Sequence, residues 1–386
     1  MLISNWIKIG LLVVTASLHL FANATVLPEE RADVLYHEYD GDGIKISGPS
    51  VLVRKNFLDK ISVSANHYVD TITSASIDVR SFGSPYEEER TQQSIGVDLL
   101  NEKSIISFSY TNSSENDYEA NTYYFGISQD FFGSMTNVSL GFAIGDDEIR
   151  ATGNEELAEK MDRQNYRLSI SQILTKKLIM GINIETVTEE GYLQNPYRKS
   201  RFIVGGSTQF RDEVYPRTKT SDAVSIRLKY HLPYRAAVHT EFRYYSDSWD
   251  IDARNIEFGY THPLEEYPLS FEVKYRFYSQ NEAEFFYDSI IGDQSPTEFH
   301  GRDKELSEYE STTYGVGVRW DFLPDGWGFL ERASVSLNYD LIEFTYESFR
   351  DATQSDAGDG GDYVVGKEPF FEFDANVIRF FFTAVY

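Results

Sequence analysis

Hydrophobic and polar residues alternate with a period of two along most of this chain, in segments of about ten residues separated by polar connections. In 269–278, for example, the apolar positions are Leu269, Phe271, Val273, Tyr275 and Phe277, and the polar ones between them include Glu272, Lys274 and Arg276. Segments 60–72, 222–230 and 313–322 repeat the pattern. A period of two gives a strand one apolar and one polar face, so the pattern predicts an all-β chain.

The alternation predicts about 16 strands, within a range of 14 to 18. The expected strands are 31–39, 44–55, 60–72, 91–100, 104–111, 118–129, 135–144, 164–173, 177–188, 222–230, 236–245, 251–262, 269–279, 312–322, 333–346 and 371–386. The first is included because an even count places both chain ends on one side of a barrel.

The length of these segments favours strands that cross a bilayer at a tilt, whereas strands of a soluble sandwich are usually shorter. The connections also alternate in length, as they do in bacterial barrels with short periplasmic turns and long outer loops. The long connections are 73–90, 112–117, 145–163, 189–221, 280–311 and 347–369, and 246–250 and 323–332 are exceptions to the alternation. We therefore expect a transmembrane, antiparallel, up-and-down β-barrel.

The first 24 residues have the pattern of a secretory signal peptide. Lys8 precedes an apolar stretch from Ile9 to Phe21, and Ala22-Asn23-Ala24 is a cleavage pattern of small residues. We expect cleavage after Ala24, with an uncleaved anchor as the alternative, and a single barrel domain over residues 25–386. No later run of eighteen apolar residues predicts a helical span.

The chain is acidic, with 61 Asp and Glu against 35 Lys and Arg and a net charge of -26. Such a charge argues against nucleic acid as a partner, because binding to phosphates needs a clustered basic surface. The chain has no cysteine, which excludes disulfides and thiolate metal sites. Aromatic residues make up 15% of the chain, so it is not a disordered acidic polymer.

If the apolar face of each strand contacts lipid, the polar face lines the lumen. In the C-terminal half that face carries the charged residues Arg227, Lys229, His239, Glu241, Arg243, Glu257, Glu272, Lys274, Arg276, Arg319, Asp321 and Arg379. In the N-terminal half it is mainly small and neutral, with Ser62, Ser64, Asn66, Ser107, Ser109, Ser139, Gly141 and Ser169. This asymmetry is typical of a charge-selective path, and equally of ion pairs that fill a barrel.

The connection 189–221 is unusual because it gathers basic residues in an acidic protein. These are Arg198, Lys199, Arg201, Arg211, Arg217 and Lys219. One interpretation is a constriction or plug whose cations face acidic wall residues. The other is a solvated outer loop that touches lipopolysaccharide phosphates.

The chain ends in VIRFFFTAVY, residues 377–386, where Ile378, Phe380, Phe382, Ala384 and Tyr386 form one alternating set. A last strand that ends in an aromatic residue is similar to the assembly signal of outer-membrane barrels, here carried by Phe380, Phe382 and Tyr386. The opposite set is more apolar than a water-filled lumen requires, so the wall beside this strand is expected to be partly packed.

An enzymatic role would need a base or a nucleophile. His67 and His239 are taken as the histidines within strands, and His239 shares a face with Glu241. No hydrolase or metalloprotease motif accompanies them, so we expect a structural histidine and no enzyme. The glycine-rich loop 356–363 matches no calcium-binding spacing, and neither a metal nor a cofactor is expected.

Several stretches resemble one uncharacterised Gram-negative family. They are SGPSVLVRKN (47–56), ISVSANHYVD (61–70), YLQNPYRKSRFIVGG (192–206) and EVYPRTKTSDAVSIRLKYHLPYRAAVHTEFRYYSDSWDI (213–251). The family is domain of unknown function 3570, and the resemblance runs over about residues 36–386, with its most specific part from Tyr192 to Ile251. It implies an outer-membrane β-barrel without assigning an activity or catalytic residues.

The first functional hypothesis is a channel or transporter in the Gram-negative outer membrane that passes a small polar solute. The alternatives are a structural or assembly barrel whose outer loops bind a partner, and an enzyme of the outer rim. The expected partners are outer-membrane lipid, lipopolysaccharide and the barrel assembly machinery, and the oligomeric state stays open.

Overall fold

The computed structural model describes residues 26–74, 86–264, 266–295, 297–356 and 361–386. Sixteen antiparallel strands form one closed barrel, in which each strand pairs with the next in the chain and β1 pairs with β19. The predicted up-and-down barrel and its 16 strands are therefore confirmed. The predicted signal peptide, residues 1–24, lies outside the described residues.

The barrel strands are β1 (Arg31–Gly41), β2 (Ile44–Phe57), β3 (Ile61–Ser74), β4 (Tyr86–Asn101), β5 (Ser104–Ser114), β6 (Tyr118–Phe131), β7 (Thr136–Ala151), β8 (Asn154–Thr175), β9 (Leu178–Gly191), β12 (Thr218–His231), β13 (Ala237–Asp247), β14 (Asp252–Pro263), β15 (Leu269–Gln280), β17 (Tyr309–Leu323), β18 (Arg332–Arg350) and β19 (Phe370–Val385). A separate small sheet contains β10 (Lys199–Val204), β11 (Ser207–Asp212) and β16 (Ile290–Ile291). Two short 3-10 helices, η2 (Lys304–Leu306) and η3 (Ala352–Gln354), lie in the loops before β17 and β19.

The two faces of the barrel wall follow the alternation of the sequence. Phe271, Val273 and Tyr275 on β15 are exposed on the outer surface, as are Tyr314 and Val316 on β17. Residues paired directly across strands share a face, so the positions between these apolar residues point into the barrel. The outer surface is apolar and the inner surface polar, the distribution that a bilayer requires of a barrel.

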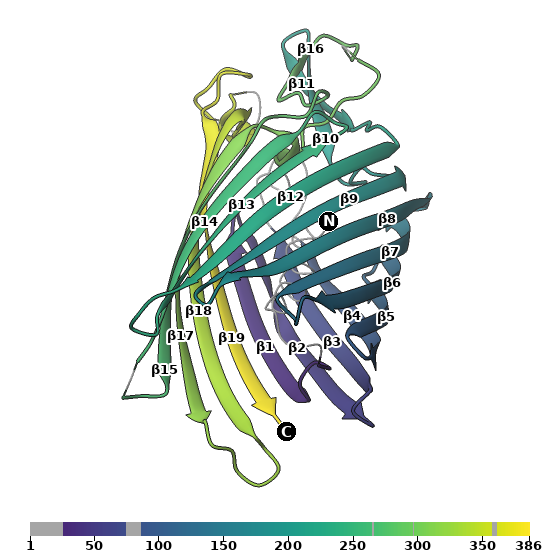
Figure 1. The fold of residues 1–386 in the computed structure, drawn as a ribbon. Helices are drawn as coiled ribbons and strands as arrows, with labels where there is room; N and C mark the ends of the chain where they lie inside the picture. Colours follow the sequence, from purple (N-terminus) through teal and green to yellow (C-terminus); the bar gives the residue numbers. More distant parts are fainter. Residues whose placement is uncertain (1–25, 75–85, 265, 296, 357–360) are drawn as a thin grey trace.

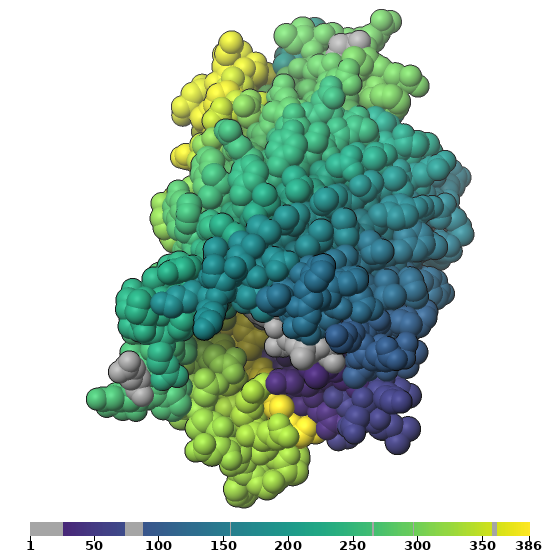
Figure 2. Space-filling view, viewed as in Figure 1, coloured from purple at the N-terminus to yellow at the C-terminus, as the bar shows by residue number. Residues whose placement is uncertain are grey.

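The two ends of the barrel differ. The small sheet of β10, β11 and β16 lies at the end that carries the long loops, opposite the C-terminus (Figure 1). The end near the C-terminus carries the short turns, and the space-filling view is hollowed there between the purple, teal and yellow-green segments (Figure 2). Among the described residues, no helix is long and apolar enough to cross a membrane.

Two of the expected long connections are short turns. Residues 145–163 were expected as a long outer loop, but β7 and β8 continue to Ala151 and from Asn154 and leave a two-residue turn. Residues 112–117 were also expected as a longer connection, but β5 ends at Ser114 and β6 begins at Tyr118. Connection 189–221 is long, as predicted, and contains the hairpin of β10 and β11. In the upper part of β7 and β8 the outward positions are polar, for example Asp146 paired with Asp162, and the period of two is therefore lost although the strands continue.

The last strand closes the barrel by pairing with both β18 and β1. Phe380 is exposed on its outer face, and Phe382 stacks on Phe322 with ring centres 6.3 Å apart. The hydroxyl of Tyr386 donates a hydrogen bond to the carbonyl oxygen of Arg54 at 2.9 Å. On the inner face Phe371 and Ala375 are buried near the outer end and Val385 near the short turns, so the packing expected beside this strand lies at its two ends.

A close approach of two backbones on β2 and β3 gives a test of this register. A Cβ atom on Gly48 would lie 1.7 Å from the carbonyl oxygen of Val69, so Gly48→Ala must push the strands apart. We expect a loss of about 2 kcal/mol or more, measured as a lower temperature of barrel unfolding in SDS gel-shift assays. In the matched control Gly181→Ala on β9 the new Cβ meets no atom within 4 Å, and stability is unchanged. Equal unfolding temperatures of the two variants would contradict the register.

Candidate functional site

The inner wall carries a belt of ion pairs from β8 to β19. Arg167 and Arg243 approach the same carboxylate, that of Glu185, at 2.6 and 3.5 Å. Lys274 and Arg379 likewise share Asp340, with Lys274 at 2.9 Å. Each of these two carboxylates contacts two cationic side chains. These groups of the belt therefore carry a net positive charge, although the protein as a whole is acidic.

The remaining predicted wall residues also lie in this belt. Arg227 donates to Glu241 at 2.6 Å, and His239 lies 3.4 Å from Glu257. Arg276 donates to the amide oxygen of Asn255 at 2.9 Å, and Glu272 lies within electrostatic reach of Lys229. Arg319 and Asp321 pair at 2.8 Å near the end with the short turns.

These charged side chains line solvent-accessible space instead of a packed core. Arg227, Arg243 and Arg379 point into the barrel and keep 31%, 28% and 25% of their side-chain surface exposed. A Cβ atom added to Gly181 on the inner face of β9 would also meet no atom within 4 Å. The middle of the lumen is therefore open enough for water.

The N-terminal half of the wall is less neutral than predicted. Ser139 and Ser128 hydrogen-bond at 2.9 Å, and Ser62 is buried, as expected of a wall of small residues. The same half also holds the pair of Arg90 and Asp70, at 2.7 Å. Asp70 lies inside a predicted strand, but Arg90 was expected in the connection 73–90, because β4 begins earlier than predicted. The pair joins β3 to β4, and its register could not be read from the sequence.

Three loops close the outer end, and we call their described residues together the cap: 192–217, 281–295 with 297–308, and 351–356 with 361–369. One buried apolar cluster joins cap residues Leu193, Phe286 and Leu306 to the barrel wall. The wall residues of this cluster are Tyr118, Ile149 and Met161 on β6, β7 and β8, and Tyr346, Phe349 and Phe371 on β18 and β19. These two groups of strands lie on opposite sides of the barrel, so the cluster crosses its mouth.

A buried ion network ties the three cap loops together. Arg201 has 1% of its side chain exposed and contacts Glu368 at 2.8 Å and Asp288 at 3.0 Å, so it joins all three loops. Arg302 binds the second oxygen of Asp288 at 3.0 Å. Removing one partner of such a buried network costs about 3 to 5 kcal/mol, because the remaining charge stays buried.

The six basic residues predicted to form a constriction divide into two groups. Arg198, Arg201 and Lys219 are buried, whereas Lys199, Arg211 and Arg217 form pairs at the surface. Arg198 binds Asp303 at 3.0 Å and Lys219 binds Asp247 on β13 at 3.0 Å. The loop does fold over the mouth, but the expectation that its cations face the wall is wrong for most of them: their partners belong mainly to the cap.

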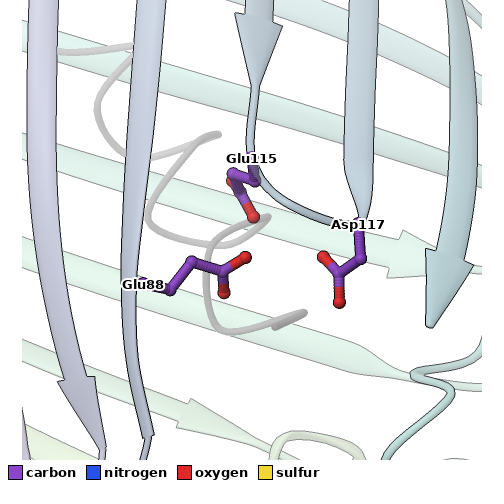
Figure 3. A group of neighbouring side chains, drawn as sticks. All are labelled: Glu88, Glu115 and Asp117. Carbon is purple, nitrogen blue, oxygen red and sulfur yellow. The ribbon is translucent and has the colours of Figure 1, made fainter. Parts of the chain in front are cut away.

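Three carboxylates converge at the outer rim, where sequence reasoning predicted no metal site. One oxygen from each of Glu88, Glu115 and Asp117 lies within 4.8 Å of the others, and Figure 3 shows the three groups directed towards one another. The hydroxyl of Tyr197, a cap residue, donates a hydrogen bond to Asp117. Burial raises the pKa of Asp117, and the charge of Glu115 adds to the effect.

The histidines differ from the expectation that His67 and His239 are the ones within strands. His37 lies in β1 and is buried, 2.9 Å from Asp70 and 3.2 Å from the hydroxyl of Tyr68. His67 is exposed on the outer face. His239 packs over Gly259, in contact with Glu257 and not with Glu241.

A closed 16-stranded antiparallel barrel with an apolar exterior and a charged interior defines a β-barrel of the outer-membrane type. The chain belongs to the family described as "Protein of unknown function (DUF3570)", whose model matches residues 76–339. The resemblance is confirmed over this range, which leaves out the stretches 47–56 and 61–70. No curated protein matches the chain in sequence.

The barrel is similar to several solved structures. A bacterial polysaccharide outer membrane secretin is 9% identical, with a TM-score of 0.49 over 93% of this chain and 100% of that one. OpdK from Pseudomonas aeruginosa is 10% identical, with a TM-score of 0.42 over 92% and 98%. The siderophore receptor PirA from the same organism is 8% identical, with a TM-score of 0.44 over 93% and 80%.

The buried carboxyl of Glu213 makes the cap sensitive to pH. Burial, reinforced by Asp303, raises its pKa to about 7, although Tyr215 and the backbone N–H of Arg302 donate hydrogen bonds to it. The pKa is higher in the folded cap than in the unfolded chain. Protonation therefore stabilises the cap below about pH 4.5, and this contribution is lost as pH rises through 7.

We predict that the protection of the cap against hydrogen exchange falls between about pH 4.5 and 7, by up to about 1.4 kcal/mol per pH unit for each buried carboxyl whose pKa is raised. Glu213→Gln should make this slope shallower. The slope that remains is due to Glu305, because burial and the charge of Asp303 also raise the pKa of its carboxyl to about 7. Hydrogen exchange of residues 192–217, corrected for intrinsic rates, measures the slope. An unchanged slope in the variant would show that Glu213 does not control it.

Proposed function

We propose that this protein is a gated channel of the Gram-negative outer membrane that passes a small polar solute, with a preference for anions. The observation that carries the proposal is the contrast between the two ends of the lumen. Charged wall residues such as Arg227 and Arg243 stay partly exposed in the middle, whereas Arg201 and Glu368 in the cap are 1% and 0% exposed. A wet lumen below a packed closure is the arrangement that a gated channel needs.

The charge of the belt supports the preference for anions. Glu185 and Asp340 each share their charge between two cations, and the partner of Arg276 is the neutral amide of Asn255. A ring of incompletely neutralised cations lowers the energy of an anion in a narrow, low-dielectric path and raises that of a cation.

The cap is the gate of the proposed channel. It is bound to the barrel by discrete contacts, among them the ion pair of Lys304 with Asp42 at the turn between β1 and β2 and the hydrogen bond from Tyr197 to Asp117. Opening would break a limited set of contacts and leave the ring of inter-strand hydrogen bonds intact.

The location and partners belong to the same proposal. The signal pattern of residues 1–24 supports export, and the exposed apolar face supports contact with outer-membrane lipid. We infer that Phe380, Phe382 and Tyr386 serve the barrel assembly machinery, and that the outer rim meets lipopolysaccharide. A non-enzymatic role agrees with the contact of His239 with Glu257 and with the ion pairs of wall carboxylates such as Glu241 and Asp340.

Single-channel recording in planar bilayers tests the gate. Arg201→Met leaves Asp288 and Glu368 buried without their cation, so the cap should open more often, by about a hundredfold for a loss of about 3 kcal/mol. Arg211→Met is the matched control, since its pair with Asp293 is at the surface and such pairs contribute little. If the folded Arg201→Met barrel conducts no more current than the wild type at every voltage, the channel proposal is wrong.

The same recordings test the belt. In the Arg201→Met background, Arg243→Gln together with Arg276→Gln should move the reversal potential in a salt gradient towards cation selectivity. Lys45→Gln is the control, because Lys45 pairs with Glu38 on an exposed part of the chain. An unmoved reversal potential would leave the belt with a purely structural role.

A further inference from the structure

The outer rim of the barrel carries a second feature, which the proposed passage of solute does not use. Glu88 extends from β4, and Glu115 and Asp117 lie in the turn between β5 and β6, so three carboxylates come from two neighbouring hairpins (Figure 3). Within the described part of the chain, these three form the group of acidic side chains whose oxygens converge within 4.8 Å. Like charges this close repel strongly unless something offsets them.

The convergence is compatible with a bound calcium ion. Ca²⁺ takes six to eight oxygen ligands at about 2.3 to 2.6 Å, so oxygens on opposite sides of one ion are roughly 5 Å apart. The observed limit of 4.8 Å lies within that span. Three carboxylates, each able to bind through one or two oxygens, supply most of such a shell.

A second observation points to a ligand at the same place. Asp117 is only 4% exposed, and its Oδ1 accepts no hydrogen bond from any residue that the structure describes, while its Oδ2 is held by the hydroxyl of Tyr197. A buried carboxylate oxygen without a donor is costly unless a cation or another donor meets it. The nearest basic residue along β4, Arg90, is held by Asp70 at 2.7 Å.

We propose that Glu88, Glu115 and Asp117 form a calcium site at the outer rim. The ion fixes the orientation of Asp117, and Asp117 in turn holds Tyr197 of the cap. Binding of Ca²⁺ does not depend on the proposed channel, whereas any effect of the ion on passage rests on it. The site joins the barrel wall to the loop of residues 192–198 and ties the closure of the mouth to external calcium.

Terbium luminescence tests the site on the full mature barrel in detergent. Tb³⁺ replaces Ca²⁺ at oxygen sites, and Tyr197 and Tyr118 are close enough to Asp117 to sensitise its emission. We expect saturable emission that Ca²⁺ displaces, and affinity at least tenfold lower in Glu88→Gln and in Asp117→Asn. The double variant Asp146→Asn with Asp162→Asn is the control, because these carboxylates face each other on the exposed outer surface.

Emission that Glu88→Gln and Asp117→Asn leave unchanged, or that only the control variant lowers, would overturn the proposal. If neither site variant folds, the wild type decides: Ca²⁺ should slow hydrogen exchange of residues 192–198 but not of the turn 58–60. Equal exchange with calcium and with a chelator would also overturn it. Neither readout involves conductance, so a silent channel and a missing calcium site can be told apart.

Discussion

The closed ring of inter-strand hydrogen bonds is the constraint on which the structure depends. A bilayer offers no donors or acceptors for an exposed backbone, so a strand-built membrane protein must pair every strand on both sides. Here β19 meets β18 and β1, and no barrel strand is left with an open edge. Closure gives every strand one face towards lipid and one towards the lumen.

The inward face then has to accommodate its charged side chains in a confined volume. It does so by pairing them between neighbouring strands and by placing small residues beside them. Gly315 lies under Asp340 and Lys274, and Gly259 lies under His239. The cap differs from the wall because it excludes water. An apolar cluster and an ion network join its loops, which are far apart in the sequence. The wall is thus wet and charged in the middle and dry at the outer end.

The sequence predicts the wall well because a period of two needs only local information. Fifteen of the 16 barrel strands and the inward position of residues such as Arg227 and Lys274 follow from alternation, and the first strand follows from the need for an even count. The outer ends of β7 and β8 were not predicted as strands, because both faces of a strand can be polar beyond the bilayer and the alternation is then lost. The ion network of the cap could not be predicted for another reason. Arg201 and Glu368 are 167 residues apart, and no local sequence pattern pairs them.

The rim site was missed on similar grounds. Glu88 sits among the acidic residues 87–89, and only the barrel register brings it beside the turn that holds Glu115 and Asp117. His37 likewise became a buried partner of Asp70 through the pairing of β1 with β2 and of β2 with β3. Contacts between side chains that depend on the register of paired strands could therefore not be predicted from the sequence.

The central claim is that the lumen is open towards the short turns and closed by the cap, and cysteine labelling tests it most directly. The chain has no cysteine, so Gly181→Cys places a single thiol in the lumen. Leu58→Cys and Ile291→Cys, both at positions 87% exposed, mark the short-turn end and the cap. In proteoliposomes treated with an impermeant charged maleimide, the labelled fraction of Gly181→Cys should follow that of Leu58→Cys. If it follows that of Ile291→Cys, the mouth is open and the account is contradicted.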